Sequence, residues 1–206
     1  MVKILDIEEI TNIYNKYILN DFPASEVKSL RRILEGVQNG QYYACAYMEE
    51  DEIKAYAFFI QSMVNKVRLL DYFAVVSDKR SKGYGSKFLR KLVELAKQDD
   101  VHMILEIENP DLARPDQDRD YMIRRKGFYE KNDIKVSNVS CSFADNEYSI
   151  LYAGNELGDE QIRAEIEGIY REFFGDEFID KNCVFHWYSR TGAIISLHWQ
   201  INANIS

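Results

Sequence analysis

The chain has 206 residues, of which 46% are hydrophobic, and a formal net charge of −8 from 26 basic and 34 acidic side chains. This length suits one domain, or one domain with an appendage, and the hydrophobic content excludes a globally disordered chain. No apolar run approaches the roughly 20 residues that a membrane-spanning helix needs, so no membrane association is expected. The acidic balance disfavours nucleic acid as the main partner and leaves a cationic substrate open.

Cysteine usage and the N-terminal segment predict a cytoplasmic location. The three cysteines, Cys45, Cys141 and Cys183, are odd in number and scattered, which fits a reducing compartment rather than a disulfide framework. No spacing of histidines, cysteines and carboxylates is typical of a metal site, so no metal is expected. The first nine residues turn acidic too early for a signal peptide.

The first half of the chain reads as two helices followed by three strands. Hydrophobic residues at helical spacing predict an amphipathic helix over residues 4–21 and a second helix that begins at Ser25, a favourable N-cap. Aromatic-rich and apolar runs then predict strands over 41–48, 53–61 and 68–75. The short connections between these strands favour antiparallel pairing.

The middle of the chain changes to the order strand, helix, strand. A helix is predicted from about residue 83 to 97 and a strand over 101–107, so a parallel strand pair with a right-handed crossover is expected. A helix over 118–131 and strands over 135–143 and 148–152 follow. The sequence therefore predicts an α/β (α+β) fold with a mixed, mostly antiparallel sheet, a central β-α-β crossover and flanking helices.

Residues 155–206 are predicted to form an appendage to a domain of residues 1–154. A helix is expected over 159–174, and strands over 183–188 and 193–200. Nine acidic and four basic residues give the appendage a net charge of −5, which is most of the negative excess of the chain. The sequence leaves open whether the appendage helix packs on its own core or on a partner subunit in a homodimer.

The turn before the central helix carries the strongest chemical signal. A hydrophobic strand ends, and the stretch 80–85, Arg-Ser-Lys-Gly-Tyr-Gly, leads into the helix. Backbone N–H groups at a helix N-terminus are unpaired and carry the positive end of the helix dipole, and the glycines let an anion approach the backbone. The spacing fits neither a Rossmann nor a Walker loop. The turn suits a pyrophosphate, and the alternative is a solvated basic turn.

This stretch resembles the first signature of the GNAT superfamily of acyl-CoA-dependent N-acetyltransferases, Gln/Arg-x-x-Gly-x-Gly/Ala between a strand and a helix. A second family element, Arg-x-x-Phe-Tyr on a later helix, is matched by Arg125, Phe128 and Tyr129. Residues 132–134, Asn-Asp-Ile, replace the usual Gly-Phe ending. The resemblance covers residues 5–152 and implies a GNAT fold and transfer of an acetyl group from acetyl-CoA to a primary amine.

The resemblance also implies which residues contact acetyl-CoA. The backbone amides of the turn would hold the pyrophosphate, with basic side chains supporting them, and the end of the preceding strand would present a backbone N–H to the thioester carbonyl. The residues expected to contact the cofactor are Phe73, Ala74, Val75, Arg80, Ser81, Lys82, Gly83, Tyr84, Gly85, Ser86, Arg125 and Phe128.

Two side chains are expected to move protons. An amine with a pKa near ~10.4 is mostly ammonium at neutral pH, so a base is needed, and an acid assists the departing thiolate. Asp71 lies inside an apolar strand at a position resembling the proposed base of the spermidine/spermine N-acetyltransferases; the alternative is an aspartate on a solvated strand face. Glu106 and Glu108 are rival bases. Tyr129 matches the general acid of the family, and the alternative is a core aromatic.

Phe22, Glu26 and Glu106 are predicted to bind the acceptor. Phe22 and Glu26 lie between the first two helices, where the family usually builds its acceptor cleft, although Glu26 also suits the first turn of a helix. The expected acceptor is a small-molecule amine, attacked directly in a ternary complex. The alternatives are a protein or peptide amine, or a non-catalytic acyl-CoA-binding regulatory module. The sequence does not identify the amine.

Overall fold

The computed structural model describes residues 1–115, 117–143, 146–188 and 194–196. The α-helices of the described part are α1 Ile7–Ile13, α2 Leu19–Asp21, α3 Leu30–Gln38, α4 Tyr84–Gln98, α5 Arg119–Glu130, α6 Asp159–Phe174 and α7 Asp176–Asn182, and a π-helical turn, Tyr14–Ile18, joins α1 to α2. The strands are β1 Val2–Ile4, β2 Tyr42–Glu49, β3 Glu52–Gln61, β4 Val67–Val75, β5 His102–Glu108, β6 Lys135–Phe143, β7 Asn146–Ala153, β8 Cys183–Tyr188 and β9 Ile194–Ser196.

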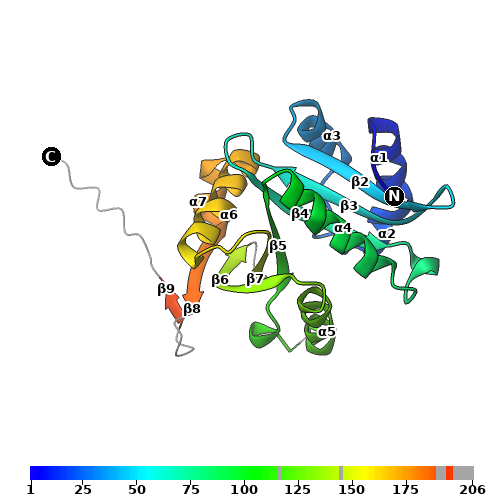
Figure 1. Cartoon of the computed structure of the whole chain (residues 1–206). Helices are drawn as coiled ribbons and strands as arrows, with labels where there is room; N and C mark the ends of the chain where they lie inside the picture. The colour runs from blue at the N-terminus through cyan, green and yellow to red at the C-terminus, as the bar shows by residue number, and fades with distance from the viewer. Residues whose placement is uncertain (116, 144–145, 189–193, 197–206) are drawn as a thin grey trace.

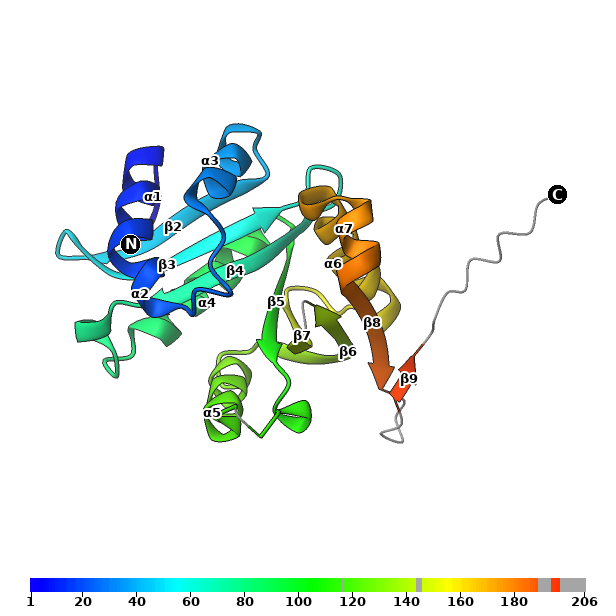
Figure 2. The same cartoon turned by 180° about the vertical axis from the view of Figure 1, so that it is seen from behind.

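The strands form one sheet in the order β1-β2-β3-β4-β5-β7-β6-β8-β9. Every neighbouring pair is antiparallel except β4 and β5, which are parallel and connected through α4. Helices α1 and α3 cover one face of the sheet and α4 covers the other (Figures 1 and 2). The mixed, mostly antiparallel sheet with a central β-α-β crossover is therefore confirmed.

The N-terminal helix starts later than expected. Val2–Ile4 pairs with β2 as an edge strand, and the helix begins at Ile7 rather than at residue 4. Asp6 and Glu9 explain the start, because the Asp6 carboxylate accepts from the Glu9 backbone N–H and Glu9 reaches back to the N–H of Asp6. This reciprocal capping box satisfies two helix N–H groups that would otherwise lack partners.

The second helix was expected from Ser25 and begins at Leu30 instead. Ser29 is its N-cap and accepts from the backbone N–H of Arg32. The preceding segment is held by Tyr72, whose hydroxyl donates to the carbonyl of Glu26 and accepts from the N–H of Lys28. These tertiary hydrogen bonds replace the bonds that a helix from residue 25 would make.

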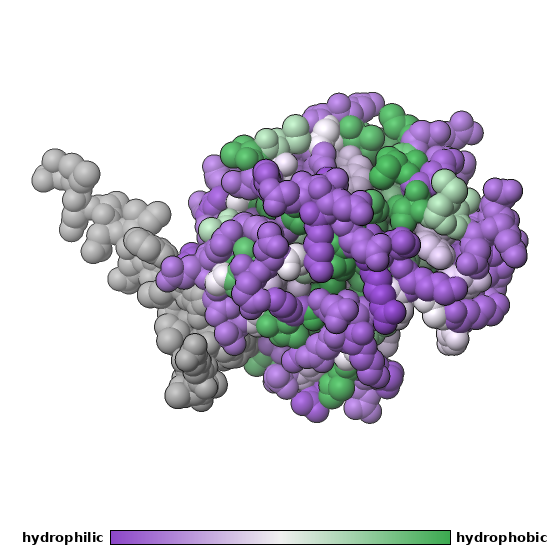
Figure 3. Space-filling view, in the orientation of Figure 1, coloured by the Kyte–Doolittle hydropathy of each residue, from purple (hydrophilic) through white to green (hydrophobic). Residues whose placement is uncertain are grey.

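The sheet separates two hydrophobic cores. One core lies between the sheet and helices α1, α3, α6 and α7, with Ile10, Ile33 and Ile166 fully buried. The other lies under α4 and α5 and includes Phe88 and Leu89. Figure 3 shows mainly hydrophilic residues on the face seen in Figure 1, with smaller hydrophobic patches between them. No helix of the described part is long and apolar enough to cross a membrane.

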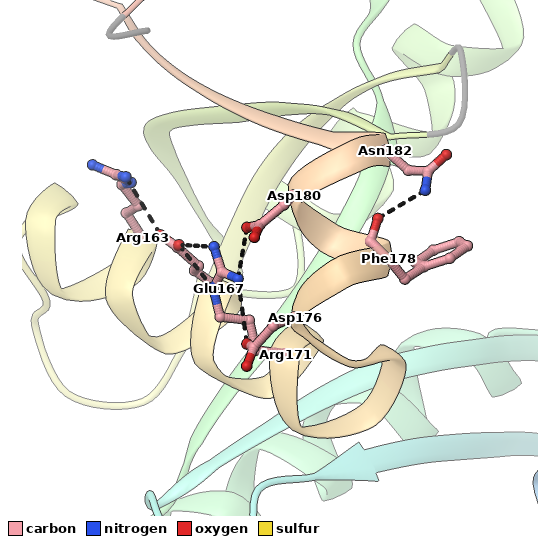
Figure 4. A network of polar contacts seen from close by, with 7 residues as sticks. All are labelled: Arg163, Glu167, Arg171, Asp176, Phe178, Asp180 and Asn182. Atoms are coloured by element: carbon pink, nitrogen blue, oxygen red, sulfur yellow. Dashed lines mark hydrogen bonds and ion pairs between the residues drawn. The ribbon is translucent and has the colours of Figure 1, made fainter. Parts of the chain in front are cut away.

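Residues beyond 155 take part in the same sheet and core. The α6 side chains Ile162, Ile166 and Ile169 are at most 1% exposed, and β8 pairs with β6. Arg171 connects α6 to α7, since its guanidinium contacts acidic side chains of both helices (Figure 4). The helix α7 was not anticipated. Of the strand expected over 193–200, Ile194–Ser196 is a strand and the other positions lie outside the described residues.

Two irregularities of β4 create the space for a site. The strand pairs with β5 only from Val67 to Leu70, and beyond this point the two strands diverge (Figure 2). A register shift opposite Phe58 and Phe59 leaves Asp71 as an extra residue of β4. Such a bulge turns two successive side chains to one face. The carboxylate of Asp71 consequently reaches the hydroxyl of Tyr42 on the face of α3 and α6.

Candidate active site

A cavity of about 450 Å³, which we call the donor cavity, lies between the end of β4, the turn before α4, and α5. It is lined by every residue expected to contact the cofactor except Lys82, and additionally by Tyr121 and Tyr129. The ammonium of Lys82 instead lies 3.2 Å from the carbonyl oxygen of Asp78. The fold therefore brings the β4 end, the turn and the Arg-x-x-Phe-Tyr segment around one space.

The turn in the donor cavity leaves backbone N–H groups open to a ligand. Gly83 is the N-cap of α4, adopts a left-handed φ of 78°, and supplies no side-chain cap. A Cβ on Gly85 would lie 3.2 Å from Val75 Cγ2 and 3.3 Å from Phe128 Cζ, so the glycine permits close packing of three elements. The first-turn amides of α4 have no acceptor within the helix, which suits a phosphate oxygen.

The side chain of Arg80 is fixed beside this turn. Its Nε donates to the Val75 carbonyl at 3.1 Å, and its Nη2 donates to Asp21 Oδ1 at 2.7 Å. The other carboxylate oxygen of Asp21 accepts from the buried Tyr56 hydroxyl at 2.8 Å. Asp21, at the end of α2, thus holds the guanidinium in place. Its involvement was not predicted, because only the tertiary fold brings residue 21 beside residue 80.

A second cavity of about 300 Å³, which we call the acceptor cavity, lies where β4 and β5 diverge. Phe22, Glu26, Asp71 and Glu106 line it. Of these, Phe22, Glu26 and Glu106 are the residues that the sequence predicted to bind the acceptor. Its remaining walls include aromatic residues that the sequence did not single out; they are Tyr72, Phe143, Tyr148, Tyr170, Phe174 and Phe178. Only Tyr170 and Phe174 lie on α6, and the helical spacing of Tyr170 indicated burial and gave no sign of a ligand.

Four charged groups of the acceptor cavity are paired. Lys28 Nζ lies 2.6 Å from Asp71 Oδ1, and the other Asp71 oxygen accepts from the hydroxyl of Tyr42. Arg125 Nη1 lies 2.9 Å from Glu108 Oε2. Each oxygen of Asp71 thus already has a partner, one of them a cation.

Two further carboxylates in the acceptor cavity, Glu26 and Glu106, form no ion pair among the described residues. Burial raises the pKa of Glu106 to about 7; the positive charge of Lys28 opposes this rise and the negative charge of Asp71 adds to it. Its Oε1 lies 3.9 Å from Cys141 Sγ. Burial also raises the pKa of Glu26, and the negative charge of Glu108 raises it further. A carboxylate that titrates near neutrality can take up and release a proton at physiological pH.

Tyr129 lines the donor cavity from the last turn of α5. It is 4% exposed, and its ring meets that of Phe128 edge-on at a centroid distance of 5.3 Å. The helix ends through Asn132, whose side-chain amide donates to the Phe128 carbonyl, and through Asp133, which takes the left-handed conformation at φ 63°. The Asn-Asp-Ile ending therefore still terminates the helix behind the tyrosine.

Across the described residues, no group of three or more His, Cys, Asp or Glu side chains could hold a metal ion. The family model for acetyltransferases of the GNAT family matches residues 7–115, which includes the turn and most of the sheet up to β5. The chain belongs to the GNAT acetyltransferase family. It is accordingly an acetyl-CoA-dependent acyltransferase. No functionally curated protein matches the sequence significantly.

Solved structures share the fold of this acetyltransferase at low sequence identity. A GNAT-family protein from Bacteroides thetaiotaomicron is 16% identical, with a TM-score of 0.69 over 85% of this chain and 99% of that chain. The ribosomal-protein-S18-alanine N-acetyltransferase of Escherichia coli is 14% identical, with a TM-score of 0.56 over 77% and 96%. A chimera containing the Vibrio cholerae spermidine N-acetyltransferase is 8% identical, with a TM-score of 0.55 over 74% and 95%.

Proposed function

We propose that this acetyltransferase transfers the acetyl group of acetyl-CoA to the primary amine of a small cationic molecule by direct attack in a ternary complex. The observation that carries the proposal is the arrangement of the donor and acceptor cavities, which share Arg125 as a lining residue. One cavity holds a turn suited to a pyrophosphate, and the other holds two unpaired carboxylates. A thioester in the first and an amine in the second would meet where the cavities join.

The donor side is assigned from the turn and the free edge of β4. The amides at the start of α4 bind the pyrophosphate, and Arg80 supports them from its fixed position. Past Leu70, β4 has lost its β5 partner, so alternate N–H groups of residues 73–75 face no neighbouring strand. One of these N–H groups stabilises the negative charge that develops on the thioester oxygen.

The proton transfers are assigned to Glu106 and Tyr129. Glu106 accepts a proton from the acceptor ammonium, so that the free amine can attack the thioester carbonyl. Tyr129 donates its proton to the thiolate that leaves when the C–S bond breaks. Asp71 is the alternative base, and we prefer Glu106 because both oxygens of Asp71 already have partners. Asp71 then contributes negative charge beside the base.

A small cationic acceptor is favoured by the size and charge of the acceptor cavity. About 300 Å³ admits a small molecule, and the aromatic residues of α6 and α7 close one side. Glu26 and Glu106 supply carboxylates that form no ion pair among the described residues, and aromatic faces attract ammonium groups. The fold similarity to a spermidine N-acetyltransferase is compatible with such an acceptor. A protein N-terminal amine is the alternative, which the similarity to an S18-alanine N-acetyltransferase keeps open.

The proposal is tested in two steps. Titration calorimetry should detect binding of acetyl-CoA, and its absence at millimolar concentration would overturn the donor assignment. Coenzyme A release is then measured with small monoamines, diamines and amino-acid amides, alongside peptides that are analysed by mass spectrometry. Release with a small amine supports the proposal, whereas acetylation confined to peptides would replace the proposed acceptor class.

A further inference from the structure

Lys28 is a cation that the chain itself places in the acceptor cavity, and the proposed function leaves its ammonium without a role. Its Nζ lies 2.6 Å from Asp71 Oδ1. The same Nζ lies 5.4 Å from the ring centroid of Tyr72 and 5.7 Å from that of Phe174. All four residues line the cavity. A carboxylate and aromatic rings around one ammonium are the groups with which proteins bind cationic ligands.

Two tyrosines fix the backbone of Lys28, so its ammonium is held in place as that of a surface lysine is not. The Lys28 N–H donates to the Tyr72 hydroxyl at 2.8 Å, and the Lys28 carbonyl accepts from the Tyr14 hydroxyl at 3.0 Å. The side chain of Lys28 is 20% exposed and that of Asp71 is 8% exposed. Because little water reaches this pair, each charge depends on the other for compensation.

The ammonium of Lys28 limits what a second cation of the acceptor can contact. Under the proposed function Glu106 serves the amine that reacts, and a second ammonium beside Asp71 would meet the like charge of Lys28. Glu26 belongs to the exposed stretch 23–26, so an ion pair there keeps its contact with water and contributes little. An acceptor with one amine and an apolar remainder avoids the repulsion, and its remainder can pack against the aromatic wall of the cavity.

We propose that Lys28 is a specificity-determining residue, whose ammonium fills the cation position beside Asp71 so that the enzyme selects acceptors with one amine over diamines. The inference deepens the proposed function and rests on it, because it concerns the acceptor of that reaction. It predicts that removing the charge of Lys28 opens this position to the second ammonium of a diamine.

Butylamine and diaminobutane, which share one carbon chain, test the selection. With the wild type, kcat/KM for butylamine should exceed that for diaminobutane by about 10-fold or more, because like charges in a cavity repel. Lys28→Met removes the charge and keeps an unbranched side chain, and it should move this ratio toward diaminobutane by about 10-fold or more. A wild-type preference for diaminobutane would overturn the proposal, as would a ratio that Lys28→Met leaves unchanged.

Further variants separate the charge of Lys28 from its part in folding. Lys28→Gln is neutral and can still donate to Asp71, so it should show the same shift even if Lys28→Met fails to fold. Lys28→Arg keeps a cation and should keep the wild-type preference. The control is Lys16→Met, which removes an exposed lysine that also lies over a ring, 4.9 Å from the centroid of Tyr17. A shift in Lys28→Arg or in this control equal to that in Lys28→Gln would contradict the proposal.

A binding measurement without acetyl transfer keeps this inference distinct from the proposed function. Diaminobutane is titrated by calorimetry into protein saturated with coenzyme A. It should bind Lys28→Gln about 10-fold or more tightly than it binds the wild type, and should raise the Tm of the variant by more. Equal affinities would overturn the Lys28 assignment even if the wild type transfers acetyl groups. Failure of the wild type to release coenzyme A with any amine would overturn the proposed function instead.

Discussion

At the scale of single residues, hydrogen-bond partners separate the carboxylates of the acceptor cavity. Asp71 is held by Lys28 and Tyr42, whereas Glu106 is half-buried and contacts a thiol that is only a weak donor. Burial disfavours the charged form of Glu106 by more than the positive charge of Lys28 favours it, which explains why the pKa of Glu106 rises to about 7. The side chain with the weakest contacts is therefore the one best suited to carry a proton.

Glu106→Gln should remove the base and its pH dependence. In the wild type, kcat/KM should rise with pH and level off above about 7, because the deprotonated form of Glu106 is the active one. The variant should lose about 100-fold or more in kcat and lose this rise. Steady-state kinetics between pH 5 and 9 measure both effects. Glu94→Gln, whose side chain is 59% exposed, is the control, and an unchanged profile in Glu106→Gln would return the role to Asp71.

Asp21→Asn should weaken acetyl-CoA binding through Arg80. The neutral amide loses the charged hydrogen bond to the guanidinium, so KM for acetyl-CoA should rise about 3- to 10-fold with a smaller change in kcat. The matched control is Asp78→Asn, which removes a 67% exposed carboxylate close to Arg80 in sequence. This carboxylate pairs with Lys79 and not with Arg80. Equal effects of both variants would show that only the overall charge of the turn matters.

At the scale of elements, local sequence determined most helices and strands. Their predicted boundaries were wrong where tertiary contacts intervene. The helices over 118–131 and 159–174 and the strands over 135–143 and 183–188 agree with the structure to within a residue. The start of the second helix was predicted too early, because the backbone of residues 26 and 28 forms hydrogen bonds with Tyr72, which lies far away in sequence on β4. Such contacts leave no trace in the periodicity of the segment itself.

The turn before α4 depends on the left-handed conformation of Gly83. Gly83→Ala should lower the free energy of unfolding by about 1 kcal/mol, because a Cβ disfavours a φ of 78° even though the space around it is open. Gly83→Asn should cost less. Urea denaturation measures the difference. Gly127→Ala, within α5, should instead stabilise the protein, and destabilisation by both alanines would exclude the backbone explanation.

At the scale of the whole molecule, the segment after residue 155 completes the acceptor cavity. Tyr170, Phe174 and Phe178 of α6 and α7 form its aromatic wall, and α6 buries its isoleucines against the sheet. The acidic residues of this segment lie elsewhere, and three of them, Glu167, Asp176 and Asp180, pair with Arg171 (Figure 4). The acidic residues that line the cavity lie instead on β4, on β5 and at residue 26.

Ile166→Ala tests whether residues 155–206 fold with residues 1–154. Removing a fully buried side chain should lower the free energy of unfolding by about 2–5 kcal/mol. If the two parts share one core, circular dichroism and tyrosine fluorescence should follow a single transition that shifts as a whole. Two separate transitions, of which only one shifts, would show that the segment unfolds on its own. The exposed Leu112→Ala is the control.

The sequence alone determined the family, the order of most elements and the turn that suits a pyrophosphate, because these depend on residues close together in the chain. The approach of Asp21 to Arg80, of Arg125 to Glu108, and of the α6 aromatics to the acceptor cavity depended on tertiary structure. The difference between the partners of Asp71 and those of Glu106 also depended on tertiary structure. Partners and burial set the chemistry of a side chain, and both are decided by residues far away in sequence.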